Sequence, residues 1–155
     1  MPTPWDKNLP NACSEPQVMK PEDLLFWVKI DEEQRAIDKD YITIIDLRGA
    51  DNKGGIIPYA LNIPAENFFQ CMIPVFKMIA AANITQVCFC DASSDGRAKR
   101  MGGLFQDFGG RMKDVGYQMG DITTYELEGG MEAWVAAGEE YTEWLNDYDP
   151  AAWKK

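Results

Sequence analysis

The sequence predicts a single α/β domain with a mostly parallel central sheet and helices on both faces. Its 155 residues are the length of one domain. Three short runs of β-branched and apolar residues alternate with longer segments of helical composition. Alternation of this kind is typical of parallel strands, because each strand needs a crossover segment to return to the edge where the next one begins.

The first third of the chain is expected to hold an irregular arm, a helix and a buried strand. Residues 1–17 contain several prolines and little periodicity, which indicates the arm. Pro21 followed by two acidic residues predicts a helix start, since both suit the N-terminal helix dipole. Residues 41–47 (YITIIDL) are typical of a buried strand, and the glycines within 48–58 indicate a turn.

The middle third predicts two helices around a second strand. Residues 65–82 have a helical composition, but Pro74 is expected to split this helix in two. Residues 84–89 (ITQVCF) predict the second strand. Residues 98–115 predict an amphipathic helix, which two internal glycine pairs weaken.

The last third predicts a strand, a helix and an extension. Residues 122–127 form the third strand, and Gly129-Gly130 opens a helix that carries Trp134. Residues 139–155 are acidic but too aromatic for a disordered tail, so we expect them to pack on the domain or over a groove. The predicted organisation is therefore an arm at 1–17, a domain at 18–138 and an extension at 139–155.

Composition excludes several classes of function. The chain has 25 acidic and 15 basic residues, four cysteines and no histidine. A histidine general base, a Cys–His pair and a His-ligated zinc site are thereby excluded, and the cysteine spacing matches no zinc pattern, so we expect no metal. The net charge of −10 argues against nucleic acid or an anionic membrane as a partner. Without a secretion signal or a long apolar run, the expected location is the cytoplasm, with the nucleus not excluded.

The turn after the second strand has the chemistry of an anion site. Residues 90–97 read C-D-A-S-S-D-G-R, at the carboxyl end of a strand, where parallel sheets bind ligands. A loop that enters a helix directs amides to one point, which favours an oxyanion and lowers the pKa of a thiol. Arg97 would supply a planar fork, and Ser93 and Ser94 small donors. From these residues alone, a buried Cys90 with a surface Arg97 is an equally weighted interpretation.

Three segments together resemble the rhodanese-like superfamily. Residues 44–64 read I-I-D-L-R-G-A-D-N-K-G-G-I-I-P-Y-A-L-N-I-P, similar to Asp-x-Arg … Gly-His-Ile-x-Gly-Ala-x-Asn-Ile-Pro. Residues 127–138 read L-E-G-G-M-E-A-W-V-A-A-G, similar to Leu-x-Gly-Gly-x-x-x-Trp-x-x-x-Gly. The third segment is the 90–97 loop. The resemblance extends over residues 18–138 and implies the α/β fold.

The loop is similar to that of the superfamily branch with mitotic-inducer dual-specificity phosphatases and eukaryotic arsenate reductases. That branch has Cys-x₅-Arg, and this chain has Cys-x₆-Arg, with Gly96 as the inserted residue. The resemblance implies that Cys90 is the nucleophile, that Arg97 binds the oxyanion, and that Asp91 and Asp95 are the loop acids and candidate proton donors. The residues implied to bind substrate are Ala92, Ser93, Ser94 and Gly96.

The resemblance implies a cysteine-dependent phosphatase or arsenate reductase acting on a phosphate-like oxyanion or a phosphorylated substrate. No cofactor is expected, except a thiol reductant such as glutathione for the reductase. The alternatives are a thiosulfate-type sulfurtransferase with a persulfide on Cys90, and a catalytically inactive interaction module. Phe89 and Ile56 stand where relatives carry histidine, and Leu47 where the mitotic phosphatases carry a second cysteine.

Overall fold

A five-stranded sheet forms the centre of the computed structural model, which describes residues 9–34, 42–93, 96–116 and 122–154. The strand order is β1-β5-β4-β2-β3, and every neighbouring pair is parallel. The predicted fold class is therefore confirmed. The strands are β1 (Gln17–Met19), β2 (Thr43–Asp46), β3 (Leu61–Asn62), β4 (Gln86–Cys90) and β5 (Thr123–Leu127).

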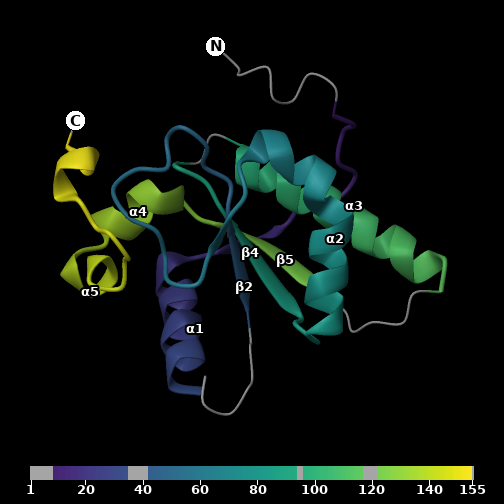
Figure 1. Ribbon diagram of the computed structural model, residues 1–155, viewed down its shortest axis with the longest axis horizontal. Helices are drawn as coiled ribbons and strands as arrows, with labels where there is room; N and C mark the ends of the chain where they lie inside the picture. Colours follow the sequence, from purple (N-terminus) through teal and green to yellow (C-terminus); the bar gives the residue numbers. More distant parts are fainter. Residues whose placement is uncertain (1–8, 35–41, 94–95, 117–121, 155) are drawn as a thin grey trace.

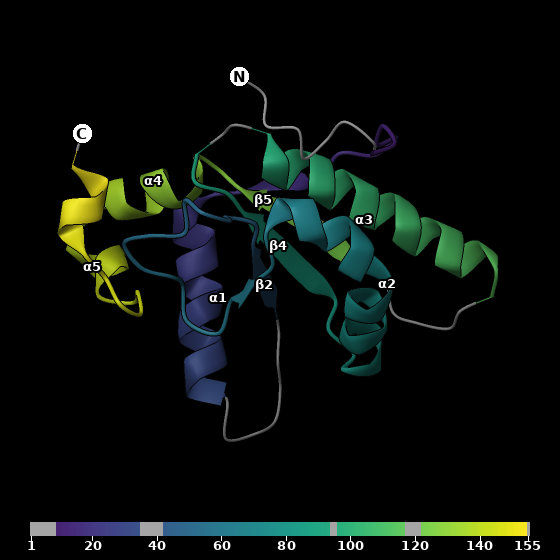
Figure 2. The ribbon, with the colours of Figure 1, turned by 45° about the horizontal axis from the view of Figure 1, so that its top comes forward.

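Helices cover both faces of this sheet. In Figure 1, α2 and α3 lie on one side of the strands, and α1, α4 and α5 lie on the other. The turned view in Figure 2 keeps the same two layers. The helices are α1 (Pro21–Gln34), α2 (Ala65–Ala81), α3 (Arg97–Asp114), α4 (Gly130–Ala136), α5 (Glu139–Thr142) and a final 3₁₀ helix, η3 (Pro150–Trp153).

Strand β4 separates the two halves of the hydrophobic core. Because successive side chains of a strand point to opposite faces, Val87 and Phe89 pack with α2 and α3. Cys88 and Cys90 point the other way, into the cluster that includes Leu24 of α1 and Trp134 of α4. These four side chains of β4 are buried, two on each face, as expected of a central parallel strand.

The expected break at Pro74 is wrong, because α2 continues through it from Ala65 to Ala81. Pro74 lies on the exposed side of the helix. Phe68 before it and Phe76 after it are both fully buried in the same cluster. Packing of both halves on one sheet face therefore outweighs the local cost of the missing amide donor.

The two edge strands, β1 and β3, do not appear in the sequence prediction. β1 pairs with β5, with Gln17 opposite Tyr125, and the chain just before it lies against α3. A Cβ on Gly103 would stand 2.3 Å from the carbonyl oxygen of Ser14. The first glycine pair of α3 thus admits the N-terminal segment rather than merely weakening the helix.

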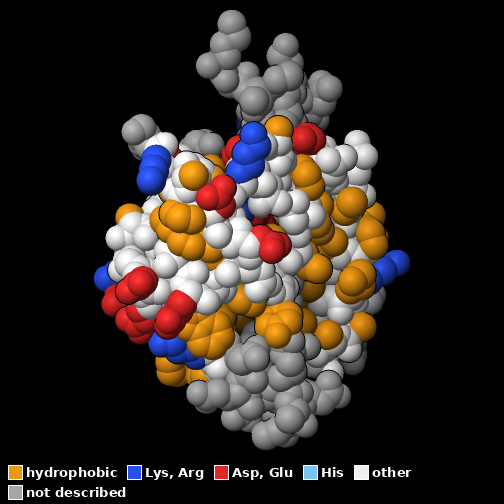
Figure 3. All heavy atoms as spheres, turned by 60° about the vertical axis from the view of Figure 1, so that its left-hand side comes forward, with side chains coloured by type: hydrophobic (Ala, Val, Ile, Leu, Met, Phe, Trp, Pro, Cys, Tyr) orange, Lys and Arg blue, Asp and Glu red, His pale blue; other side chains and the backbone are white. Residues whose placement is uncertain are grey.

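The C-terminal segment packs on the turn that follows β2. Ile56 and Asn146 exchange two backbone hydrogen bonds, of 3.0 and 2.9 Å. The indole of Trp153 donates to the carbonyl oxygen of Gly54 at 3.0 Å. Figure 3 shows the face that carries this segment, where acidic side chains gather.

Candidate functional site

The ends of β2 and β4 meet at one edge of the sheet. Asp46 pairs with Cys90 in the parallel register, and the Leu47 amide donates to the Cys90 carbonyl oxygen at 2.9 Å. The residues that follow these strands, including Asp51 and Asp91, are therefore brought together although they are distant in sequence. This is the edge at which an open parallel sheet binds ligands.

Asp91 lies at the centre of this edge, with its side chain only 2 % exposed. Its carboxylate accepts hydrogen bonds from the backbone amides of Ala92 at 2.8 Å, Arg97 at 3.0 Å and Ala98 at 3.4 Å. The Arg97 guanidinium adds a donor, since its Nε lies 2.7 Å from Asp91 Oδ1. We call these three amides and this guanidinium the oxyanion cradle. It is built from the loop and the N-terminus of α3, where the helix dipole also favours a negative charge.

Arg97 is held by a second carboxylate, that of Asp51, on its outer side. Both terminal nitrogens of Arg97 donate to Asp51, one of them at 3.2 Å. Burial alone would lower the pKa of Arg97, but its bonds to Asp51 and Asp91 raise it above the ordinary value. Burial alone would raise the pKa of Asp51, yet its bonds with Arg97 hold it below 3.8. The guanidinium is thus cationic, and Asp51 is ionised near neutral pH.

The backbone of the loop is fixed by the N-terminus of α4. The Met131 amide donates to the Asp91 carbonyl oxygen at 2.8 Å, and the Glu132 amide donates to the Ala92 carbonyl oxygen at 2.9 Å. A Cβ on Gly130 would stand 2.6 Å from the Asp91 carbonyl oxygen, so only glycine allows this approach. In a planar trans peptide the carbonyl and the next amide point in opposite directions. The bonds to α4 therefore direct the Ala92 amide toward the cradle.

Cys90 differs from the expectation of a low pKa. β4 extends one residue further than predicted, so Cys90 belongs to the sheet and is 1 % exposed. The contact with the Cys88 thiol, burial, and the charge of Asp46 raise the pKa of Cys90 well above 9.0, while Arg48 lowers it less. The amides at the start of α3 stabilise the Asp91 carboxylate instead of a thiolate. In this conformation Cys90 is a protonated thiol.

The Asp-x-Arg motif of the first segment is a buried ion pair that shapes the following turn. Arg48 donates to both oxygens of Asp46, with the shortest contact at 2.7 Å, and both side chains are essentially inaccessible. The same guanidinium donates to the carbonyl oxygens of Lys53 and Gly55. Its role is therefore to close the turn after β2, which places Asp51 beside Arg97.

The remaining predicted site residues have varied positions. Ala92 and Ser93 are half-buried in the loop, and Gly96 is the exposed N-cap of α3 with φ of +100°. Ser94 and Asp95 lie outside the described residues. Asp91 occupies the cradle and is not a free acid. The sequence interpretation missed Asp51. Its position just after β2 could have identified it, because β2 is the neighbour of β4 in the sheet.

The two positions where histidine was expected are structural in this chain. The Phe89 ring meets those of Phe68 and Phe105, with centroid distances of 5.3 and 5.8 Å. Ile56 forms the bridge with Asn146. Both positions therefore contribute packing or backbone pairing, and neither carries a proton donor.

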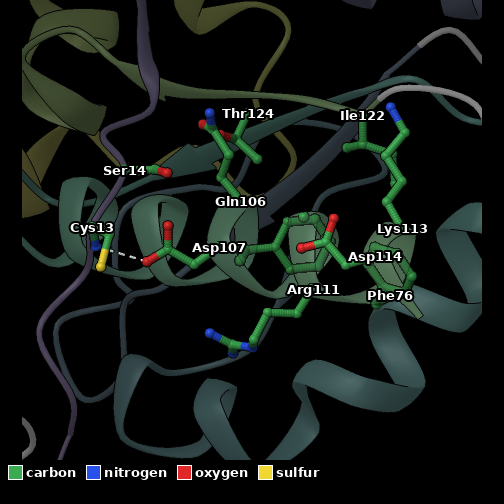
Figure 4. Close-up of a pocket in the computed structure, with 13 residues that line it drawn as sticks. Cys13, Ser14, Phe76, Gln106, Asp107, Arg111, Lys113, Asp114, Ile122 and Thr124 are labelled. Atoms are coloured by element: carbon green, nitrogen blue, oxygen red, sulfur yellow. Dashed lines mark hydrogen bonds between the residues drawn. The ribbon is translucent and has the colours of Figure 1, made fainter. Parts of the chain in front are cut away.

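Two surface hollows are lined by residues that the structure describes. One, of about 670 Å³, borders the cradle and is lined by Asp51, Ala92, Trp153 and others, with Lys53 and Lys154. The other, of about 520 Å³, follows the later turns of α3. Figure 4 shows this second hollow, where the Cys13 amide donates to Asp107 at 2.7 Å. Only the first hollow adjoins the residues of the site.

The described residues contain no cluster of three or more potential metal ligands. Within the same ranges, no helix is both long and apolar enough to cross a membrane.

Comparison with known proteins places this chain in a family. The sequence profile of the rhodanese-like domain matches residues 30–137. The chain belongs to the rhodanese-like domain family. A search of the curated proteins found no match for this rhodanese-like chain.

Solved structures share the fold of this rhodanese-like domain. Ygr203w of Saccharomyces cerevisiae, a homolog of single-domain rhodanese and the Cdc25 phosphatase catalytic domain, aligns with a TM-score of 0.70 and 16% identity over 89% of this chain and 91% of its own. A second structure of Ygr203w, described as a yeast protein tyrosine phosphatase of the rhodanese family, gives 0.64 and 17% over 89% and 96%. The As-Sb reductase from Leishmania major gives 0.62 and 22%, over 84% of both chains.

Proposed function

We propose that this rhodanese-like domain is a cysteine-dependent oxyanion enzyme, an arsenate reductase or a phosphatase, with Cys90 as nucleophile. The observation that carries the proposal is the convergence of three amides and the Arg97 guanidinium on one carboxylate, directly after Cys90. Donors arranged for a carboxylate are also suited to the oxygens of phosphate or arsenate. The fold shared with a phosphatase-like protein and with an As-Sb reductase is consistent with this chemistry.

Because Cys90 is a protonated thiol in this conformation, both reactions begin with loss of its proton, and the resulting thiolate attacks a tetrahedral oxyanion. With arsenate, an S–As bond forms and hydroxide leaves, taking a proton to become water. A second thiol, of the glutathione class, then attacks the Cys90 sulfur; the S–As electron pair stays on arsenic, which leaves as arsenite, and the two sulfurs form a disulfide. With a phosphate ester, a phosphocysteine forms, the alcohol leaves and water hydrolyses the intermediate.

The carboxylates of the site favour arsenate over alkyl phosphate esters. Asp91 and Asp51 both form ion pairs with Arg97, so neither holds a proton for a departing alkoxide. Arsenate carries protons on its own oxygens, and its leaving group is hydroxide. Aryl phosphates leave without a proton donor and are the phosphate substrates that this site would accept.

The second candidate is a catalytically inactive interaction module. The observation that favours it is the state of Cys90, which is buried beside Cys88 with its pKa raised. A nucleophile in this state has little thiolate near neutral pH. In such a module the Asp91–Arg97 pair would serve only to hold the loop.

The test compares wild type, Cys90→Ser and a matched Cys13→Ser variant; Cys13 is exposed, and its amide is bonded to Asp107 of α3. Arsenite formation with glutathione, p-nitrophenyl phosphate hydrolysis, and thiocyanate formation from thiosulfate and cyanide are measured for each. We expect arsenite formation that Cys90→Ser abolishes and Cys13→Ser leaves unchanged. Turnover equal in wild type and Cys90→Ser would refute the catalytic proposal, silence in all three assays would favour the module, and Cys90-dependent thiocyanate alone would indicate a sulfurtransferase.

A further inference from the structure

We propose that Asp91 is a specificity-determining residue of the cradle: its carboxylate is a resident anion that an incoming oxyanion must displace. The inference rests on the proposed function only in placing the oxyanion at the cradle. It adds that access is decided by competition between two anions for the same donors. Cys90 has no part in that competition.

The contacts of Asp91 are those that a bound oxyanion would need. Its two oxygens take the amides of Ala92, Arg97 and Ala98 and a fork of Arg97, at 2.6 to 3.4 Å. The side chain is 2 % exposed, so a phosphate cannot bind these donors while the carboxylate remains. One set of donors therefore serves two mutually exclusive anions.

Displacement needs only the side chain to move. The carbonyl oxygens of Asp91 and Ala92 are bonded to the α4 amides, which fixes the peptide that carries the Ala92 donor. When the Asp91 side chain rotates away, the Ala92 amide and the α3 amides keep their directions. The cradle is thus preorganised for the anion that replaces the carboxylate.

The hollow beside the cradle provides the route for the exchange. Ala92 lines it, and its charged lining residues are two acids, Asp51 and Glu132, and two lysines, Lys53 and Lys154. The Arg97 side chain is 14 % exposed, and its partner Asp51 lines the hollow.

Charge decides which anion wins. A resident carboxylate carries one negative charge, so a doubly charged oxyanion such as hydrogen phosphate or hydrogen arsenate gains more from Arg97 and the helix dipole. A singly charged anion such as nitrate gains no such advantage. Asp91 thereby selects tetrahedral dianions against the common monoanions.

Asp51 provides a matched control, because it also pairs with Arg97 but accepts none of the cradle amides. Binding of inorganic phosphate and of nitrate is measured by titration calorimetry for wild type, Asp91→Asn and Asp51→Asn. We expect Asp91→Asn to bind phosphate at least about tenfold more tightly than wild type. In wild type phosphate must break the charge-assisted hydrogen bonds of the Asp91 carboxylate, and losing one such bond corresponds to about tenfold in affinity. It should also bind nitrate measurably, whereas Asp51→Asn should stay within about threefold of wild type.

Unchanged or weaker phosphate binding by folded Asp91→Asn would overturn the proposal, as would an equal gain in Asp51→Asn. Asp91→Ser, which keeps a small acceptor for the first amides of α3, replaces Asp91→Asn if that variant does not fold. Wild type gives an independent readout: phosphate should shift the Arg97 Nε–H resonance, and saturating phosphate without a shift contradicts the exchange. Cys90→Ser separates the two proposals. If this variant loses turnover but still binds phosphate, the result concerns catalysis by Cys90 and leaves the anion exchange at Asp91 unaffected.

Discussion

Replacing Gly130 with alanine tests whether the α4 N-terminus fixes the site loop. Gly130 has φ of +64°, and an added Cβ would stand 2.6 Å from the Asp91 carbonyl oxygen and 2.8 Å from the Ser93 amide nitrogen. Both of these atoms belong to the backbone, so no flexible side chain can relieve the contact. Either the loop or α4 must move.

The magnitude follows from two contributions. Alanine in the left-handed region costs roughly 1–2 kcal/mol. Separating the loop from α4 loses the bonds of the Met131 and Glu132 amides, each worth about 0.5–1.5 kcal/mol. Gly130→Ala is therefore expected to lower the free energy of unfolding by about 2–5 kcal/mol.

Gly116→Ala is the matched control, because Gly116 has φ of +87° but nothing within 4 Å of its added Cβ. It carries only the conformational cost of about 1–2 kcal/mol. Urea unfolding, followed by tryptophan fluorescence, gives both free energies. If the two variants are equally stable, the contact between Gly130 and the loop does not position the site, and our account of the cradle is refuted.

Three further predictions concern charged and titrating groups. Cys90 should be alkylated by iodoacetamide far more slowly than exposed Cys13 near neutral pH and faster as the pH rises, because its pKa is raised; equal rates by mass spectrometry would contradict this. Arg48→Ala leaves the buried Asp46 unpaired and should cost about 3–5 kcal/mol in urea unfolding, whereas a cost below about 1 kcal/mol would contradict a buried pair. The folded pKa of Asp51 is below 3.8, so its contribution to stability is present above pH 3.8 and lost as the pH falls through the folded value. Asp51→Asn should therefore lose less stability than wild type as the pH falls. An unchanged dependence of the free energy of unfolding on pH in the acid range would show that the ion pair with Arg97 contributes nothing.

The sequence predicts the centre of the fold better than its edges. β2, β4 and β5 lie in runs rich in β-branched and apolar residues, and the predicted ends of all three are within two residues of the observed ends. β1 and β3 have three and two residues, too few for a period to emerge. The continuity of α2 through Pro74 depends on burial on both sides of the proline, which no local pattern records.

The site loop was predicted, but its state was not. Cys90 was expected just beyond the strand, and the one extra residue in β4 places it on the buried face with Cys88. That Asp91 occupies the cradle depends on a side-chain orientation that the sequence leaves open. The Asp51–Arg97 contact joins residues 46 positions apart and follows from the parallel register of β2 and β4.

The pairing of β1 with β5 also determines the order in which the sheet is completed. Among the described strands β1 comes first and β5 last, so the backbone donors that β1 gives to β5 have no partner until residues 123–127 have been synthesised and placed. Long-range parallel pairing of this kind makes folding slow, since a large loop closes before the contacts are gained. Amide protection in β1 should appear together with that of β5 during refolding. Val18, which is 56% exposed, lies in β1, the strand whose pairing partner is synthesised last.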